Sequence, residues 1–187
     1  MKTPFRISCD DGCASDMRLA ELCMKYMFDD VVFYIPAEWH SLALAKGYEP
    51  LVRGEVDALA SRFELGGHTI THRHLTSIPF EEALYEILAG STIMEQLFNV
   101  KITKFCPPRG YTNPGLTEIA LSHHQSQRLT KGPGLVHIHP DSGANGNRPW
   151  RECIDENTTE LWCHSWELDK YDLWKELEEV LSEYSPL

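Results

Sequence analysis

Two histidines four residues apart, His68 and His72, are the first side chains whose spacing could carry chemistry. This spacing brings two imidazoles to one face of a helix or turn, which is a common way to hold a metal ion. A zinc-protease motif of the form His-Glu-x-x-His would place a glutamate base at the second position, but Thr69 stands there. A lone histidine pair is more often incidental than functional, and any catalytic base would have to come from another segment.

A pair of adjacent carboxylates, Asp10 and Asp11, precedes Gly12. A turn between a strand and a helix often contains Asp and Gly, so a purely structural role is one interpretation. Two neighbouring carboxylates repel each other, however, when they end an apolar strand. Their presence is better explained if one of them binds a cation while the other acts as a general base.

A third histidine, His164, follows an apolar run and has a tryptophan two residues away on either side. It could be a structural histidine packed beside an aromatic ring. In the functional alternative, Trp162 and Trp166 line a cleft, where the flat apolar face of an indole suits a sugar ring. His137 and His139 alternate along a predicted strand and therefore face one side of it. A place in the site and a structural role are both open for these two.

The elements that must position these residues alternate between strands and helices. Runs of β-branched and aromatic residues predict strands at 5–9, 31–35, 63–65, 102–106, 126–129, 135–139 and 160–163. Helical spacing of apolar residues predicts helices at 15–27, 54–63, 81–98, 116–123 and 170–183. Strands separated by helix-length connections indicate an α/β fold with a mostly parallel sheet. About seven strands in this length favour a distorted (β/α) barrel, with an open doubly wound sheet as the alternative.

The chemically active residues share one position in these elements, because each group directly follows a predicted strand. Asp10 and Asp11 follow the first strand, His68 follows the third, and His164 follows the last. The segment 107–110, Pro-Pro-Arg-Gly, follows the fourth strand. Ligands and catalytic groups of parallel α/β folds collect at the carboxyl ends of the strands. We therefore expect these four segments to form one site.

The overall composition excludes several classes of function. The chain has 187 residues, which fits a single domain spanning 1–187, and its formal net charge is −11. This charge argues against binding to nucleic acid or to an anionic membrane, both of which need Lys and Arg. The sequence has no apolar window that could span a bilayer and no secretion signal. We therefore expect a cytoplasmic protein whose six cysteines are mostly small buried hydrophobic residues.

Four segments together resemble successive motifs of the polysaccharide deacetylase family, which is also called carbohydrate esterase family 4 or the NodB-homology family. They are Asp10-Asp11-Gly12, Gly67-His68-Thr-Ile-Thr-His72, Phe105-Cys-Pro-Pro-Arg-Gly110 and Leu161-Trp-Cys-His164. The resemblance runs from residue 5 to residue 167 in the family's order, so it covers nearly the whole chain. It implies a distorted (β/α) barrel with about seven strands.

The resemblance also implies a role for each site residue. The implied catalytic groups are Asp10 as the base, His164 as the general acid and the backbone N–H of Arg109 as an oxyanion donor. The implied metal ligands are Asp11, His68 and His72. These imidazole and carboxylate ligands suit Zn²⁺ best, and Fe²⁺, Co²⁺ and Ni²⁺ are also compatible with them. The residues that we expect to contact the carbohydrate substrate are Pro108, Tyr111 and Trp166.

The reaction implied by this resemblance is metal-dependent hydrolysis of an N-acetyl group on an amino-sugar-containing glycan or glycan precursor. One alternative is a related C–N hydrolase that acts on a cyclic amide, and another is a carbohydrate-binding barrel without turnover. Two positions depart from the family pattern. Cys106 stands where the family has an arginine that pairs with the catalytic Asp, and Arg109 stands where the family has an aromatic residue. Our hypothesis is that Arg109 or Arg151 supplies the missing guanidinium.

Overall fold

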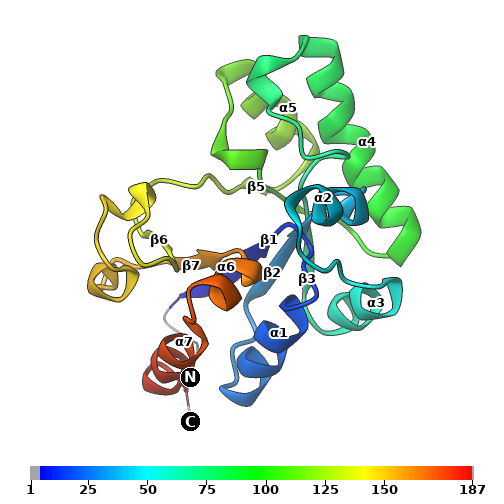
Figure 1. Cartoon of the computed structure of the whole chain (residues 1–187). Helices are drawn as coiled ribbons and strands as arrows, with labels where there is room; N and C mark the ends of the chain where they lie inside the picture. The colour runs from blue at the N-terminus through cyan, green and yellow to red at the C-terminus, as the bar shows by residue number, and fades with distance from the viewer. Residues whose placement is uncertain (1–4, 187) are drawn as a thin grey trace.

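The structure, a computed structural model, describes residues 5–186. At its centre, seven parallel strands curl into a half-barrel (Figure 1). The strands are β1 (Arg6–Asp10), β2 (Val31–Ile35), β3 (Glu64–Gly67), β4 (Lys104–Phe105), β5 (Ser126–Gln127), β6 (Leu135–His137) and β7 (Glu160–Cys163). Their order across the sheet is β5-β4-β3-β2-β1-β7-β6, and every neighbouring pair is parallel.

This strand order separates the barrel from the doubly wound alternative. The chain steps from β1 to β5 in one direction, and then returns through β6 and β7 onto the other side of β1. A doubly wound sheet would instead place the next strand beside β1 and build outward from there. Strands β5 and β6 occupy the two edges of the sheet, so the barrel is open between them. The predicted fold, a distorted (β/α) barrel with about seven strands, is confirmed.

Helices follow the strands and cover the outside of the sheet (Figure 1). They are α1 (Asp16–Lys25), α2 (Trp39–Lys46), α3 (Arg53–Arg62), α4 (Phe80–Phe98), α5 (Pro114–His123), α6 (Ser165–Lys170) and α7 (Trp174–Glu183). Short 3₁₀ turns lie at Leu75–Ser77, Pro108–Gly110, Gly143–Asn145 and Trp150–Cys153. Phe5 and Tyr184 bring the two ends of the described chain together, because their ring centroids are 5.2 Å apart.

The core is packed around the three central strands. Strand β2 is buried along its whole length, as expected for a parallel strand that is covered on both faces. Ile7, Phe33 and Leu161 are each 0% exposed, and burial of such a side chain stabilises the fold by about 2 kcal/mol. All six cysteines are free thiols and five of them are buried, which agrees with their predicted role as small hydrophobic residues.

The structure differs from the sequence-based expectation in several elements. Helix α2 was not expected, because its alanines and leucines do not gather on one face. The helix predicted at 170–183 begins only at Trp174, as α7, and it is preceded by the unpredicted α6, which ends at Lys170; Asp172 between the two helices has a left-handed φ of 53°. Strands β4 and β5 have only two residues each and are shorter than predicted. Among the described residues, no helix combines the length and apolar character required to cross a membrane.

Candidate active site

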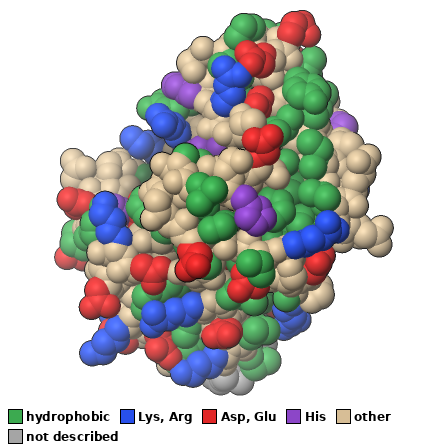
Figure 2. All heavy atoms as spheres, turned by 45° about the vertical axis from the view of Figure 1, so that its right-hand side comes forward, with side chains coloured by type: hydrophobic (Ala, Val, Ile, Leu, Met, Phe, Trp, Pro, Cys, Tyr) green, Lys and Arg blue, Asp and Glu red, His purple; other side chains and the backbone are tan. Residues whose placement is uncertain are grey.

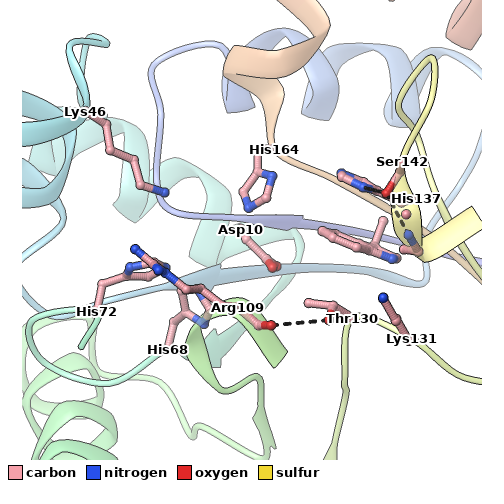
Figure 3. Close-up of a pocket in the computed structure, with 13 residues that line it drawn as sticks. Asp10, Lys46, His68, His72, Arg109, Thr130, Lys131, His137, Ser142 and His164 are labelled. Atoms are coloured by element: carbon pink, nitrogen blue, oxygen red, sulfur yellow. Dashed lines mark hydrogen bonds between the residues drawn. The ribbon is translucent and has the colours of Figure 1, made fainter. Parts of the chain in front are cut away.

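The carboxyl ends of the strands open into a cavity of about 380 Å³ (Figure 3). Seven of the residues singled out in the sequence line it, namely Asp10, His68, His72, Arg109, His137, Trp162 and His164. Asp11 lies directly beneath them and is 0% exposed. The expectation that these segments form one site is therefore correct, because strand ends that are far apart in sequence meet at one edge of the sheet.

Asp11, His68 and His72 place one ligand atom each within 4.8 Å of one another. The Asp11 Oδ1 atom is 3.1 Å from His72 Nε2 and 3.5 Å from His68 Nε2. This oxygen is buried and has no hydrogen-bond partner, which is costly for a carboxylate. A divalent cation between the three side chains would remove that cost, and two imidazoles with one carboxylate are a donor set that such ions accept. The residues therefore fit a metal site.

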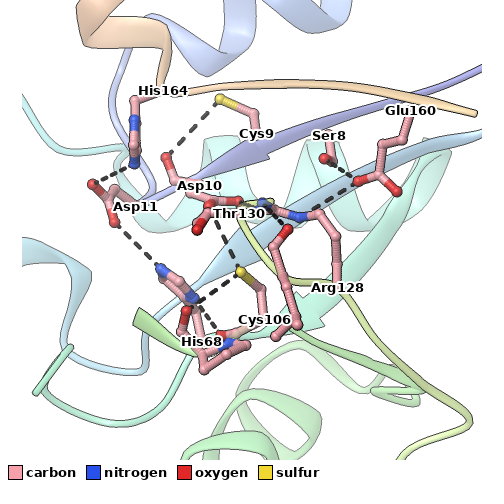
Figure 4. Close-up of polar contacts among 12 residues, drawn as sticks. Ser8, Cys9, Asp10, Asp11, His68, Cys106, Arg128, Thr130, Glu160 and His164 are labelled. Carbon is pink, nitrogen blue, oxygen red and sulfur yellow. Dashed lines mark hydrogen bonds and ion pairs between the residues drawn. The ribbon is translucent and has the colours of Figure 1, made fainter. Parts of the chain in front are cut away.

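A backbone carbonyl orients one of these imidazoles. His68 Nδ1 lies 2.6 Å from the carbonyl oxygen of Cys106, which can only accept, so Nδ1–H must be the donor. The other ring nitrogen, Nε2, then carries the lone pair and faces Asp11 (Figure 4). A second partner that fixes the tautomer is typical of histidines that ligate metals.

His68 and His72 lie on an irregular loop, so the expected helical turn at this pair is not formed. Thr69 and His72 both have left-handed backbone angles, with φ of 71° and 59°. A buried carboxylate on α4, Glu86, holds the loop in place. It accepts hydrogen bonds from the backbone N–H groups of Ile70 and Thr71, both at 2.9 Å, and from the Thr71 hydroxyl at 2.6 Å. Sequence reasoning missed Glu86, because it looked like one more acidic residue on a helix.

A lysine also reaches the metal-site carboxylate. Lys46, the last residue of α2, places its Nζ 2.5 Å from Asp11 Oδ2. Its side chain is 31% exposed while that of Asp11 is fully buried, so the lysine enters the site from the solvent side. This contact could not be predicted from the sequence, because helix α2 itself was not predicted.

The second carboxylate of the pair, Asp10, forms a buried ion pair with Arg128 (Figure 4). Arg128 follows β5, and its guanidinium lies between the rings of Tyr34 and Trp162, 5.0 and 4.9 Å from their centroids. Arg128 Nε is also 3.4 Å from Glu160 Oε1. Burial alone would raise the pKa of Asp10, but the charge of Arg128 and then that of His68 lower it, so the carboxylate stays ionised.

This ion pair corrects the hypothesis about the missing guanidinium. Arg151 lies on the surface, where it pairs with Glu179 at 2.9 Å and with Glu183 at 3.5 Å. Arg109 lines the cavity but has no ion pair with Asp10. Neither of the two proposed arginines contacts Asp10, and Arg128 does so instead. Sequence reasoning had counted Arg128 only as part of a weak strand.

His164 is held by a glutamate on the following helix. Its Nδ1 lies 2.8 Å from Glu167 Oε2, and its Nε2 lies 3.7 Å from Asp11 Oδ2. The same Glu167 oxygen accepts a hydrogen bond from His137 Nε2 at 3.0 Å. Burial would raise the pKa of Glu167, but the hydrogen bonds from His137 and His164 lower it strongly. Burial would likewise lower the pKa of His164, yet the charge of Asp11 and the bond to Glu167 raise it.

The remaining predicted residues are placed in different ways. His137 reaches the cavity and stacks on Trp162, with 3.7 Å between the ring centroids. Trp166 lines a neighbouring cavity instead, where it stacks against Tyr48. Tyr111 is 53% exposed and packs on a histidine outside the cavity. Pro108 is buried in its 3₁₀ turn and does not line the cavity. His139 lies close to Asp141 and Glu167.

Solved structures with the same fold are carbohydrate esterases and related proteins. Peptidoglycan deacetylase PdaC from Bacillus subtilis is 18% identical, with a TM-score of 0.68 over 98% of this chain and 85% of that one. A family 4 carbohydrate esterase from Streptomyces lividans is 14% identical, with a TM-score of 0.71 over 97% and 88%. BA3943 from Bacillus anthracis, described as a CE4 family pseudoenzyme, is 17% identical, with a TM-score of 0.64 over 96% and 62%.

Sequence comparison identifies the family. A search of curated protein sequences finds no match to this chain. The profile of the family described as "Polysaccharide deacetylase" matches residues 7–126, which is more than half of the chain. The matched region includes Asp10, Asp11, His68 and His72. The chain therefore belongs to the polysaccharide deacetylase family.

Proposed function

We propose that this protein is a metal-dependent hydrolase that removes an N-acetyl group from an amino-sugar-containing glycan or glycan precursor. The observation that carries the proposal is the buried Asp11 Oδ1, which accepts no hydrogen bond and faces His68 and His72, with Asp10 and His164 lining the adjoining cavity. A cation-binding site, a carboxylate base and a histidine acid are the groups that hydrolysis of an acetamide requires. Membership of the family supports the same reaction.

The metal site consists of Asp11, His68 and His72. A divalent ion bound there supplies Lewis acidity that polarises the acetamide carbonyl and acidifies a water molecule. We propose Zn²⁺ as the ion, because it accepts two imidazoles and one carboxylate while keeping positions free for water and substrate. Fe²⁺, Co²⁺ and Ni²⁺ suit the same ligands.

Asp10 is the proposed general base. Its carboxylate lines the cavity, where it can take a proton from the attacking water. The ion pair with Arg128 keeps Asp10 ionised and fixes the direction in which its other oxygen points. Arg128 itself is 6% exposed and packed between two aromatic rings, so its guanidinium is held in one position. We propose Arg128 as the positioning residue for Asp10.

His164 is the proposed general acid. Glu167 binds the Nδ1 side of its imidazole, so the Nε2 side faces the metal ligands and the cavity. From there the ring can donate a proton to the nitrogen that leaves as the C–N bond breaks. The backbone N–H of Arg109 is the proposed donor to the oxyanion. Arg109 has a left-handed φ of 60°, a strained conformation of a kind that clusters at functional sites.

The nature of the substrate is supported by two structural neighbours. PdaC and Bc1960 share the fold, and they are described as a peptidoglycan deacetylase and a peptidoglycan N-acetylglucosamine deacetylase. A different neighbour is described as a pseudoenzyme, which makes a carbohydrate-binding protein without turnover the second candidate. The complete set of base, acid and ligands in this chain favours catalysis.

The experiment is an assay of acetate release from N-acetylglucosamine oligomers by protein loaded with Zn²⁺, Co²⁺ or Ni²⁺. We expect the release of one acetate for each free amine that forms. The Asp10→Asn variant should lose this activity while its metal content stays unchanged. Ring opening of cyclic ureides in place of acetate release would contradict the proposal in favour of a cyclic amidase. Tight oligomer binding without turnover under every metal would favour the binding protein.

A further inference from the structure

A second set of possible metal ligands lies beside the proposed metal site. In the described part of the chain, His137, His164 and Glu167 also place one ligand atom each within 4.8 Å of one another. Glu167 Oε2 is 2.8 Å from His164 Nδ1 and 3.0 Å from His137 Nε2. One carboxylate oxygen again faces two imidazole nitrogens, and this is a donor set that divalent ions such as Zn²⁺ accept.

Three different elements bring these donors together at the wall of the cavity. His137 ends β6, His164 directly follows β7, and Glu167 lies on α6. His137 and His164 both line the cavity, so an ion can reach them from the solvent. In Figure 3 their rings line one side of the cavity, and those of His68 and His72 line another. The second set is therefore accessible, and its donors are different from those of the first.

A neighbouring hydroxyl prepares His137 for an ion. Its Nδ1 lies 2.8 Å from the Ser142 hydroxyl, which can accept a hydrogen bond as well as donate one. When Nδ1–H donates to Ser142, the lone pair of His137 Nε2 is free to face Glu167 Oε2. A partner on the second ring nitrogen is typical of histidines that ligate metals.

The two sets differ in the state of their carboxylate oxygens. Asp11 Oδ1 accepts no hydrogen bond, whereas Glu167 Oε2 is within hydrogen-bonding distance of two imidazoles. An ion at the second set must replace these hydrogen bonds, and its binding releases the protons that they contain. We therefore expect weaker binding there, so that the second set fills only when the metal is in excess.

We propose that His137, His164 and Glu167 form a second, weaker site for a divalent cation such as Zn²⁺. His164 lies between the two sites, because its Nε2 is 3.7 Å from Asp11 Oδ2 while its Nδ1 faces Glu167. An ion on Nδ1 takes the place of the proton there, and the ring can no longer act as the proposed general acid. Excess metal then inhibits the reaction. This consequence rests on the proposed deacetylase function, whereas the site itself does not.

The test is equilibrium dialysis of the His68→Ala/His72→Ala variant against increasing Zn²⁺, because this variant lacks the first site. We expect it to bind about one ion per chain, and wild type about two, when the metal is in excess. The Kd of the variant should be at least about 100-fold higher than that of the first site in wild type, since two charge-assisted hydrogen bonds are replaced. A variant that binds no ion would overturn the inference.

Further substitutions in the same double variant connect the ion to its ligands. His137→Gln and Glu167→Gln should each weaken zinc binding by at least about tenfold. His40→Ala/His123→Ala, on two exposed histidines, is the matched control and should change nothing. On the face shown in Figure 2 the histidine side chains lie apart from one another, as single adventitious ligands would. Binding that both Gln variants retain, or that the control loses, would mean adventitious ions only.

Crystals of wild type in excess Zn²⁺ locate the ion without any substitution. Anomalous scattering should show a peak between His137, His164 and Glu167, and ions found only elsewhere would overturn the site.

Activity measurements separate the second site from the proposed function. Acetate release by wild type with one equivalent of Zn²⁺ should fall when excess Zn²⁺ is added, and it should fall less in His137→Gln. The ratio of the two rates cancels any general effect of the substitution. If no sugar is deacetylated, the dialysis still tests the site although the deacetylase function has failed. A second ion that binds without lowering kcat would overturn the inhibition.

Discussion

Arg128 and Asp10 form a buried ion pair although 118 residues separate them in the sequence. Arg128 follows the edge strand β5, and its side chain passes between Tyr34 and Trp162 to reach the end of β1. Removing one partner of a buried pair leaves an unpaired charge in the core, at a cost of about 3–5 kcal/mol. The pair is therefore important for stability as well as for the direction of the Asp10 carboxylate.

The Arg128→Gln variant should lose at least about 100-fold in kcat/KM, because the base is no longer held, and should unfold at a lower temperature. Assays and calorimetry on the same preparation measure both effects. The matched control is Arg151→Gln, which breaks an exposed pair and should change stability by less than about 1 kcal/mol.

Moving the arginine from position 128 to position 106 separates the effect of Arg128 on the direction of Asp10 from its effect on stability. Cys106 Sγ lies 3.8 Å from Asp10 Oδ2, so an arginine at this position, directly after β4, could reach the same carboxylate. We expect Arg128→Ala/Cys106→Arg to recover activity relative to Arg128→Ala alone, since the alanine vacates space between the two rings. Equal activity of wild type and a folded Arg128→Gln variant would show that Asp10 needs no arginine.

Lys46 competes with a metal ion for Asp11. Its Nζ is 2.5 Å from Asp11 Oδ2, so a divalent cation bound to this carboxylate must overcome the repulsion of the ammonium group. The Lys46→Met variant should therefore bind Zn²⁺ more tightly than wild type, by about tenfold in a chelator competition. Lys170→Met, on a neighbouring cavity, is the control. Weaker zinc binding by Lys46→Met would mean that the lysine supports the metal site.

The buried carboxyl of Asp16 should make the stability of the metal-free protein depend on pH. Burial raises its pKa to about 7, and one of its oxygens lacks a hydrogen-bond partner. The folded state then holds a proton that the unfolded chain releases near its usual pKa of about 4. The contribution of Asp16 to the free energy of unfolding should thus be full below about pH 4 and fall as the pH rises to 7. Asp16→Asn should remove this pH dependence of the free energy of unfolding. Denaturant titrations of wild type and variant at pH 5 and pH 8 measure it, and an equal pH dependence in both proteins would contradict the prediction.

The sequence was informative about the fold and about residues that follow strands. A strand was predicted at each of the seven places where the structure has one. The signal was clearest for β2, because a parallel strand that is buried on both faces is a continuous run of β-branched and aromatic residues, and it was weak for the two-residue strands β4 and β5. Their positions after strands predicted that Asp10, Asp11 and His68 would meet at one edge of the sheet, and the family resemblance implied that Asp11, His68 and His72 bind a metal. In the structure these three side chains lie close enough to hold one ion. These signals are local in sequence and depend on residue type.

The residues that support the site could not be predicted in the same way. Arg128, Glu86 and Glu167 are ordinary charged residues until the fold brings each to a distant or buried partner. Lys46 depends on a helix whose apolar residues show no helical spacing. Only packing distinguishes these side chains from exposed charges, and packing is a property of the whole chain.

Metal content tests the central claim most directly. Purified wild type, reconstituted with Zn²⁺ and freed of excess ion, should contain about one divalent ion per chain, held by Asp11, His68 and His72. The His68→Ala/His72→Ala variant should contain none, and His74→Ala, on a half-buried histidine nearby, should retain the ion. A wild type that binds no metal after reconstitution, or a double variant that binds as much as wild type, would contradict this account.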